Sequence, residues 1–372
     1  MQYKHSMLTL VLASACSVTL PAPAAAQAAS STPLADPIVR SAQVVRQPAK
    51  AYLTAVAQAG KRIVAVGERG IIILSDDGGV SWRQAQVPSS VSLTAVQFPT
   101  PADGWAVGHY GVILHSRDGG ASWTRQLDGV QAAQLVLRDA QAPAAGAAPA
   151  AAAGAYLAEA RRLVADGPDK PFLALHFSDV NNGIVVGAYN LAVRTRDGGA
   201  SWTPISGRLD NPGGNHLYAV GVSGNTVYIA GEQGLLLRSG DNGERFERID
   251  LPYKGSFFAL GISGGQVAVG GLGGNAFRSG DQGASWSRIP VPMPVSITAM
   301  RAQGDTLLMA NQAGMLLRAS ASGPVAVLKT PPLAPLSDVL VQPDGAIIAV
   351  GMSGAVRLPA QPGVIHDSTA AK

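Results

Sequence analysis

Five aspartates recur in one short pattern, and carboxylates in repeated glycine-rich turns could bind calcium. They are Asp77, Asp118, Asp197, Asp241 and Asp281, each the third residue of S/T-x-D-x-G-x-x-W/F. A calcium loop gathers several carboxylates and ends in a bidentate glutamate. Each of these turns has only one or two carboxylates and no such glutamate. The Ser or Thr and the Asp can instead hydrogen-bond N–H groups of their own turn, so we expect a structural role and no metal site.

Arginines recur just before the later patterns. Arg194, Arg238, Arg278 and Arg318 stand at the same position in four successive repeats, with His115 at that position in an earlier one. An arc of guanidinium groups would bind an acidic protein or a lipid headgroup. Alternatively, each arginine pairs with an aspartate of a neighbouring pattern. Both interpretations stay open, and the four arginines are our candidate partner-binding residues.

Candidate catalytic groups are sparse. Glycoside hydrolysis needs two carboxylates flanking the bond, and Glu68 and Glu232 are the one pair of glutamates at equivalent turns. They lie three repeats apart, too far to cooperate. Arg288-Ile289-Pro290 has the letters of a sialidase motif but falls inside a repeat. The histidines lack metal-ligand spacing and no nucleophile elbow is present. We therefore expect no enzyme activity, no catalytic residues and no cofactor.

The aspartate patterns mark an internal repeat. Their aspartates are separated by 41, 79, 44 and 40 residues, so the unit has about 40 residues and the long interval holds an insertion. In the first repeat, alternating stretches at 53–56, 63–66 and 71–74 precede the pattern, and Trp82 opens a fourth. Trp123, Trp202 and Trp286 hold the same position in other repeats. A four-stranded antiparallel meander with a buried aromatic residue is typical of a propeller blade.

Two degraded copies near the C-terminus bring the number of repeats to seven. The predicted blades are 51–87, 91–128, 171–207, 216–252, 256–292, 295–332 and 335–360. We therefore predict an all-β fold, a seven-bladed β-propeller with a small helical insertion, over residues 51–360. The last blade is a strand short, and the segment 27–50, through its residues 37–50, could return to complete it and close the ring. Residues 361–372 form a C-terminal tail.

The insertion at 129–170 has its own pattern. Residues 134–140 and 156–165 are predicted to be helical, and the Ala/Pro/Gly-rich residues 141–154 join them. One interpretation is a helical hairpin with a flexible tip. The other is a partner-docking arm with Leu157 and Leu163 on its apolar side, since long insertions often carry function.

The repeats resemble Asp-box (BNR-type) propellers. The phrases at 104–111 (GWAVGHYG) and 183–187 (GIVVG) are similar to the photosystem II stability and assembly factor family, over about residues 50–360. The resemblance implies a non-catalytic exported propeller that helps to assemble a membrane-protein complex, photosystem II in phototrophs, and basic patches figure in recognition by this family. Sialidases and cellulose-active hydrolases share the Asp box, so an Asp-box glycoside hydrolase is the alternative function.

The N-terminus predicts export. Residues 1–26 have the features of a signal peptide: Lys4, an apolar run at 7–20 and Ala24-Ala25-Ala26 before Gln27. Lipoprotein processing at Cys16 is the alternative. We expect no transmembrane segment in the mature chain and a periplasmic or envelope location. The net charge of +4 is too small for a nucleic-acid-binding field, so the expected partner is a protein, a membrane-protein complex or its assembly intermediate.

Overall fold

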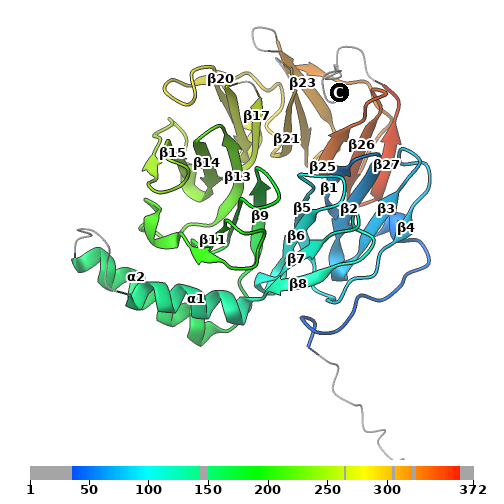
Figure 1. The fold of residues 1–372 in the computed structure, drawn as a ribbon. Helices are drawn as coiled ribbons and strands as arrows, with labels where there is room; N and C mark the ends of the chain where they lie inside the picture. Colours follow the sequence, from blue (N-terminus) through cyan, green and yellow to red (C-terminus); the bar gives the residue numbers. More distant parts are fainter. Residues whose placement is uncertain (1–35, 143–149, 264, 304–305, 321–323, 361–372) are drawn as a thin grey trace, which may run out of the picture. The chain divides into compact units, whose positions relative to one another are not determined.

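Seven antiparallel sheets follow one another along the chain, in a computed structural model that describes residues 36–142, 150–263, 265–303, 306–320 and 324–360 (Figure 1). Within each sheet the strands are hydrogen-bonded neighbours in chain order or its reverse. The first strands of the sheets contact one another in a closed ring, because β25 contacts both β21 and β1. The predicted all-β, seven-bladed propeller is therefore confirmed.

We number the blades in chain order. Blades 1 to 3 are β1 (Leu53–Ala59), β2 (Arg62–Gly67), β3 (Ile72–Ser75) and β4 (Arg83–Gln84); β5 (Leu93–Gln97), β6 (Gly104–Gly108), β7 (Ile113–Ser116) and β8 (Thr124–Leu127); and β9 (Phe172–Phe177), β10 (Gly183–Gly187), β11 (Ala192–Thr195) and β12 (Thr203–Pro204). Blades 4 and 5 are β13 (Leu217–Ser223), β14 (Thr226–Gly231), β15 (Leu236–Ser239) and β16 (Glu247–Arg248); and β17 (Phe257–Ser263), β18 (Gln266–Gly271), β19 (Ala276–Ser279) and β20 (Ser287–Ile289). Blades 6 and 7 are β21 (Ile297–Gln303), β22 (Thr306–Asn311), β23 (Leu316–Ser320) and β24 (Ala326–Val327); and β25 (Leu336–Val341), β26 (Ile347–Gly351) and β27 (Gly354–Leu358).

The strand order creates two edges. One edge carries the turns between third and fourth strands, where the Asp boxes lie, and we call it the box edge. The other carries the turns between second and third strands together with the links between blades, and we call it the connection edge. Short 3₁₀ turns form several of its corners: η2 (Glu68–Gly70), η3 (His109–Gly111), η5 (Glu232–Gly234) and η6 (Leu272–Gly274). A further one, η4 (Ser206–Arg208), follows blade 3.

The apolar core lies between neighbouring blades. Val64 and Leu74 of blade 1, for example, pack with Leu93, Leu114 and Trp123 of blade 2 in one cluster. Because successive side chains of a strand face opposite sides of its sheet, each middle strand is buried on both faces. This explains the run of fully buried residues from Ile63 to Val66. The repeat therefore encodes the contact between blades as well as the blade.

The Asp-box side chains hold their own turns together. Asp77 accepts from the N–H groups of Val80 and Ser81 at 3.1 and 2.9 Å, and Ser75 Oγ accepts from Gly79 N at 2.7 Å. The hydroxyl of Ser81 also donates to Asp77. These hydrogen bonds to the charged form hold the pKa of Asp77 at about 2. The carboxylates of Asp118, Asp197, Asp241 and Asp281 make equivalent bonds within their own turns.

The aromatic residues of the boxes pack beneath these turns. Trp123 and Trp202 are buried, and Trp82 is half-buried against the cluster between blades 1 and 7. Trp123 Nε1 donates to Gly120 O at 2.9 Å, and Trp286 Nε1 donates to Gly283 O at 3.1 Å. Each such indole therefore joins the turn to the core between the blades.

The insertion forms two helices, α1 (Gly129–Gln141) and α2 (Ala150–Asp166), beside blade 3 (Figure 1). Both extend beyond the predicted stretches. Asp128 caps α1 through a reciprocal capping box with Gln131, and this signal sets the start ahead of the predicted residue 134. The proposed tip at 141–154 falls partly at 143–149, outside the described residues. No helix in the described part of the chain combines the length and apolar composition of a membrane crossing.

The last blade keeps three strands, and residues 37–50 do not add a fourth. Their regular element is the 3₁₀ turn η1 (Pro48–Lys50), which contacts β27. Proline at its first position has no N–H to donate to a strand ladder. Upstream, Ile38 is buried with residues of blades 1 and 2, and Pro37 O accepts from Ser90 N at 2.9 Å. The segment thus runs from the last strand of blade 7 along the outside of blades 1 and 2 without adding a strand to the ring.

Closure is made by the inner strands. Each of the seven inner strands has a register irregularity around its second residue. The residue that follows is alanine in blades 1 to 6, namely Ala55, Ala95, Ala174, Ala219, Ala259 and Ala299. In blade 7 it is Asp338, which is 6% exposed and accepts from Val56 N of blade 1 at 3.1 Å. Arg301 of blade 6 donates to the same carboxylate at 2.5 Å. Asp338 therefore links blades 6, 7 and 1.

Candidate functional site

The four candidate arginines lie at one position of the third strand, at the box edge of blades 3 to 6. Arg194 is on β11, Arg238 on β15, Arg278 on β19 and Arg318 on β23. Arg194 is buried and the other three are half-buried. The propeller thus brings these residues into one series, as the repeat predicts, but with most of their surface covered.

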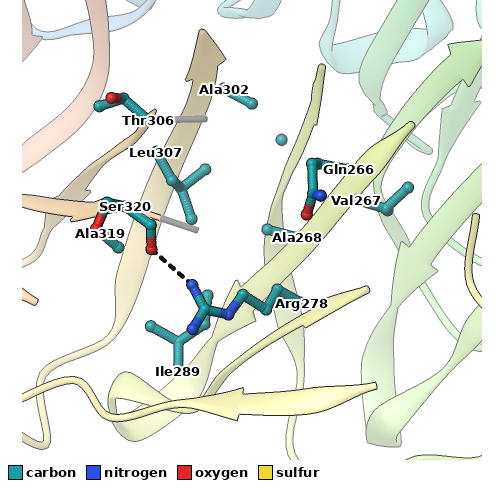
Figure 2. A pocket seen from close by; sticks show the side chains of 11 residues that line it. Gln266, Val267, Ala268, Arg278, Ile289, Ala302, Thr306, Leu307, Ala319 and Ser320 are labelled. Carbon is teal, nitrogen blue, oxygen red and sulfur yellow. Dashed lines mark hydrogen bonds between the residues drawn. The ribbon is translucent and has the colours of Figure 1, made fainter. Parts of the chain in front are cut away.

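Two of these arginines contact the next blade, one at its Asp box and the other at the end of its third strand. Arg194 Nη1 donates to Glu244 Oε1 in the box of blade 4 at 2.8 Å. Arg278 Nη1 donates to Ser320 O of blade 6 at 2.6 Å, across the space between the two blades shown in Figure 2. Arg238 packs its side chain near Gly283 in the box of blade 5. Their contacts are made with a glutamate and with backbone, whereas the box aspartates are engaged within their own turns.

The same contact recurs around the ring with other side chains. The bonds are Arg62 Nη1 to Asp118 O (3.2 Å), Gln126 Nε2 to Gly198 O (2.8 Å), Tyr228 OH to Gln282 O (2.7 Å) and Arg357 Nε to Gly78 O (3.0 Å). With Arg194 and Arg278 they form a set that we call the blade-to-box bonds. Because the last of them joins blade 7 to blade 1, the set runs across the closure. Arg194 and Arg278 therefore help to hold neighbouring blades together.

One group of arginines converges on a single carboxylate at the junction of blades 3 and 4. Glu244 binds Arg194 at 2.8 Å, Arg196 at 2.7 Å and also Arg208. We call these three residues the arginine trio. The pKa of Glu244 is held below its usual value mainly by the hydrogen bond from Arg194, together with the positive charges of Arg194 and Arg208. Three guanidinium groups around one carboxylate offer more hydrogen-bond donors than that carboxylate can accept, which suits an acidic ligand.

Sequence reasoning identified Arg194 but missed the other members of this group. Arg196 and Arg208 fall outside the repeated position, and Arg208 belongs to the link between two blades. The sequence does contain a sign of this group at Glu244, because the equivalent positions in the other boxes hold Val80, Ala121, Ala200 and Ala284. A glutamate where the other boxes have apolar residues indicates a basic side chain nearby.

The central channel is lined by the inner strands and is largely aliphatic. Its polar lining side chains include Gln97, His176 and Arg301. Burial lowers the pKa of His176 to about 4, so this imidazole is neutral at pH 7. The carboxylate in the described lining of the channel is Asp338, whose pKa is raised by burial and lowered in part by Arg301. It is engaged by Arg301 and by two backbone N–H groups.

The two glutamates considered as a hydrolytic pair are tied to separate blades. Glu68 accepts from Tyr52 N at 3.3 Å, and Glu232 accepts from His216 N at 3.1 Å. Both occupy connection-edge turns, in blades 1 and 4. Among the described residues, no group of three or more His, Cys, Asp or Glu side chains has the arrangement of a metal site.

This architecture defines an Asp-box β-propeller, and the carboxylate in the described lining of its channel is Asp338. The sequence model of the photosynthesis system II assembly factor YCF48 family matches residues 41–133 and 163–364, and the chain belongs to that family. It is thus a Ycf48-like propeller that resembles photosystem II assembly factors. The resemblance predicted from the repeat phrases is confirmed.

Individual relatives are more distant. The photosystem II assembly lipoprotein Ycf48 of Synechococcus sp. (strain CC9902) is 34% identical over 77 residues, which are 21% of this chain and 23% of that protein. The matched segment therefore spans about a quarter of the relative's length. A solved structure of YCF48 bound to D1 peptide has a TM-score of 0.59 at 15% identity, over 86% of this chain and 96% of that one. The GH74 xyloglucanase from Xanthomonas campestris has a TM-score of 0.55 at 14% identity, over 83% and 52%. At these identities the solved structures show the fold alone.

Proposed function

We propose that this protein is an exported, non-catalytic scaffold that binds a protein partner during assembly or stabilisation of a membrane-protein complex. The observation that carries the proposal is the family match, which extends over all seven blades. The solved structure of YCF48 with a bound D1 peptide supports a polypeptide as the ligand of this kind of propeller. By the same resemblance, the complex in a phototroph would be photosystem II.

The absence of hydrolysis is part of the proposal. The described channel offers one carboxylate, Asp338, already engaged by Arg301, whereas glycosidases need two carboxylates about 5 to 9.5 Å apart. Propellers of similar fold include a xyloglucanase, so the test uses xyloglucan and a sialylated oligosaccharide. We expect no release of reducing sugar or sialic acid above that of heat-treated protein. Release that is lost in Asp338→Asn would contradict the proposal.

For the binding surface we propose the arginine trio, together with the accessible parts of Arg238, Arg278 and Arg318. The side chain of Arg196 is 60% exposed and that of Arg208 is 33% exposed, so both can contact a partner in their present conformations. Arg194 is buried and orients the group through Glu244. An acidic segment of the partner would replace or supplement Glu244 as the acceptor.

The test is affinity capture from solubilised envelopes with the full chain as bait. We compare wild type with Arg196→Ala/Arg208→Ala and with the quadruple Ala variant of Arg194, Arg238, Arg278 and Arg318. Arg248→Ala is the matched control, because Arg248 pairs with the exposed Asp250 outside the trio. We expect the trio variant to lose a membrane-protein partner that the control retains. Equal capture by every variant, with melting temperatures unchanged, would refute this surface.

Export is proposed from residues 1–26, which lie outside the described residues, and from the lipoprotein nature of the Synechococcus relative. Mass spectrometry of the processed protein tests it. A first residue of Gln27 indicates cleavage of an ordinary signal peptide, and a lipid-modified Cys16 indicates a lipoprotein. An unprocessed chain confined to the cytoplasm would contradict export.

A further inference from the structure

A cavity with a volume of about 600 Å³ lies on the connection edge, between α2 and the rims of blades 3 and 4. This is within the size range of ligand-binding clefts. Tyr156 of α2 packs on Gly207, where a Cβ atom would come within 2.9 Å of its ring. The Tyr156 hydroxyl donates to Asp139 of α1 at 2.9 Å. The helical hairpin is thereby held against the blades, and α2 forms one wall of the cavity.

The wall that α2 contributes lies largely outside the part of the chain shared with the family. The family match stops at residue 133 and resumes at 163, so it omits most of α2. The cavity therefore combines a common rim with an addition of this chain.

Positive charges at the cavity are already neutralised. Lys170 Nζ lies 3.2 Å from Asp166 and 2.5 Å from Asp169, and Arg162 lies 3.8 Å from Asp166. Two cations and two carboxylates thus balance along one side. The remaining charge of the lining comes from two other carboxylates, Glu159 and Glu232.

These two glutamates lack a lysine or arginine partner within the described chain. Glu159 extends from α2 so that Oε1 comes within 3.5 Å of the Cβ position of Gly214 on the opposite wall. Burial raises the pKa of Glu159, as expected for a carboxylate that no cation compensates. Glu232 lies 3.8 Å from His216 Nδ1, but that nitrogen accepts the N–H of Tyr189 at 3.1 Å. In this arrangement the imidazole does not donate to Glu232 from Nδ1.

Aromatic surface lies beside the carboxylates. Tyr189 is 52% exposed, and the ring of His216 meets it edge-on at 4.6 Å. Lys170 Nζ is 5.1 Å from the Tyr189 ring, so this ring already accepts one cation. Aromatic faces next to carboxylates bind the alkyl stem and the charged head of a cationic side chain together.

We propose that this cavity receives a lysine or arginine side chain of a protein partner, with Glu159 and Glu232 binding its charged head and Tyr189 its stem. The inference rests on the proposed function in that it assumes a protein partner, but it places a second contact on the edge opposite the Asp boxes. Because the whole chain has a net charge of +4, general electrostatics would repel a basic ligand. Binding of such a ligand would therefore report a local site.

The experiment titrates the full chain with acetylated, amidated tetralysine by calorimetry at low salt. We expect binding that weakens about tenfold in Glu159→Gln and again in Glu232→Gln, since each substitution removes a charge-assisted hydrogen bond and a tenfold loss corresponds to about 1.4 kcal/mol. Asp250→Asn, which removes a carboxylate that is 86% exposed elsewhere in blade 4, is the charge-matched control and should bind as wild type does. Melting temperatures establish that each variant is folded.

Three results would overturn the inference: no binding by wild type, equal affinity in all variants, or equal loss in the control. Binding of n-butylammonium as tight as that of tetralysine would also overturn it, because the site would then serve free amines. A negative result in this titration does not bear on the capture experiment with the arginine trio, so the two proposals can be refuted separately.

Discussion

The pair formed by Arg301 and Asp338 provides a sharp test of how the ring closes. Asp338 replaces the alanine of the other six inner strands and lies where blades 6, 7 and 1 meet. Arg301→Ala leaves that buried carboxylate with two backbone N–H donors and no cation. Breaking a buried pair from one side costs about 3 to 5 kcal/mol. Because the Arg301 side chain is 43% exposed and water can replace it in part, we expect about 3 kcal/mol.

The reverse substitution should cost less. Asp338→Ala restores the alanine found in the other blades and leaves Arg301 to the solvent of the channel. Its main loss is the acceptor of Val56 N, worth about 1 to 2 kcal/mol. The double variant should then be close to Asp338→Ala alone, so the two substitutions are strongly non-additive.

The assay is urea unfolding followed by tryptophan fluorescence, with the free energy compared only at equal m-values. The pKa of Asp338 is raised in the folded state, so its carboxylate contributes less to stability as the pH rises through that value. Removal of Arg301 raises this pKa further. The deficit of Arg301→Ala should therefore shrink as the pH falls and Asp338 takes up a proton. An additive double variant, or a deficit that grows in acid, would refute this account of closure.

Three further predictions concern the boxes. Asp118→Ala removes the acceptor of Ser122 N and should lower stability by about 1 kcal/mol. Because the pKa of Asp118 is lowered in the folded protein, this contribution is complete above pH 3.8 and falls as the pH drops towards the lowered pKa, so the difference from wild type in urea unfolding should be smaller at pH 3 than at pH 7. Gly79→Ala forces a φ of +89° on a residue whose Cβ would lie 2.5 Å from Ile348 Cδ1, and should cost about 1 to 3 kcal/mol in the same assay, whereas Gly78→Ala meets no neighbouring atom and should cost less. Glu244→Gln weakens the internal partner of the arginine trio, so acetylated tetraglutamate should bind more tightly in calorimetry; unchanged affinity would argue against an anion site there.

The blades could be predicted because residues typical of each strand, each turn and each buried aromatic recur in the sequence at a fixed interval. The links between blades could not, since they join residues that are far apart in the chain. Arg301 and Asp338 come from different repeats, and Arg208 meets Glu244 only because two blades are packed together. The start of α1 was placed too late, although Asp128 and Gln131 form a capping box there, because Gly129 and Val130 weaken the helical pattern. The arginine series was found, but its burial depends on the next blade.

The bond between Val56 and Asp338 also sets the order in which the protein can mature. Its two partners are separated by 282 residues, so the first blade made is completed by the last. Until blade 7 arrives, the inner strand of blade 1 lacks its neighbour and the turn at Gly78 lacks Arg357. Contacts between such distant segments form slowly, and unpaired strands invite association with other chains. Closure of the ring therefore waits for the last blade, and blade 1 gains its neighbour only when the whole propeller has been made.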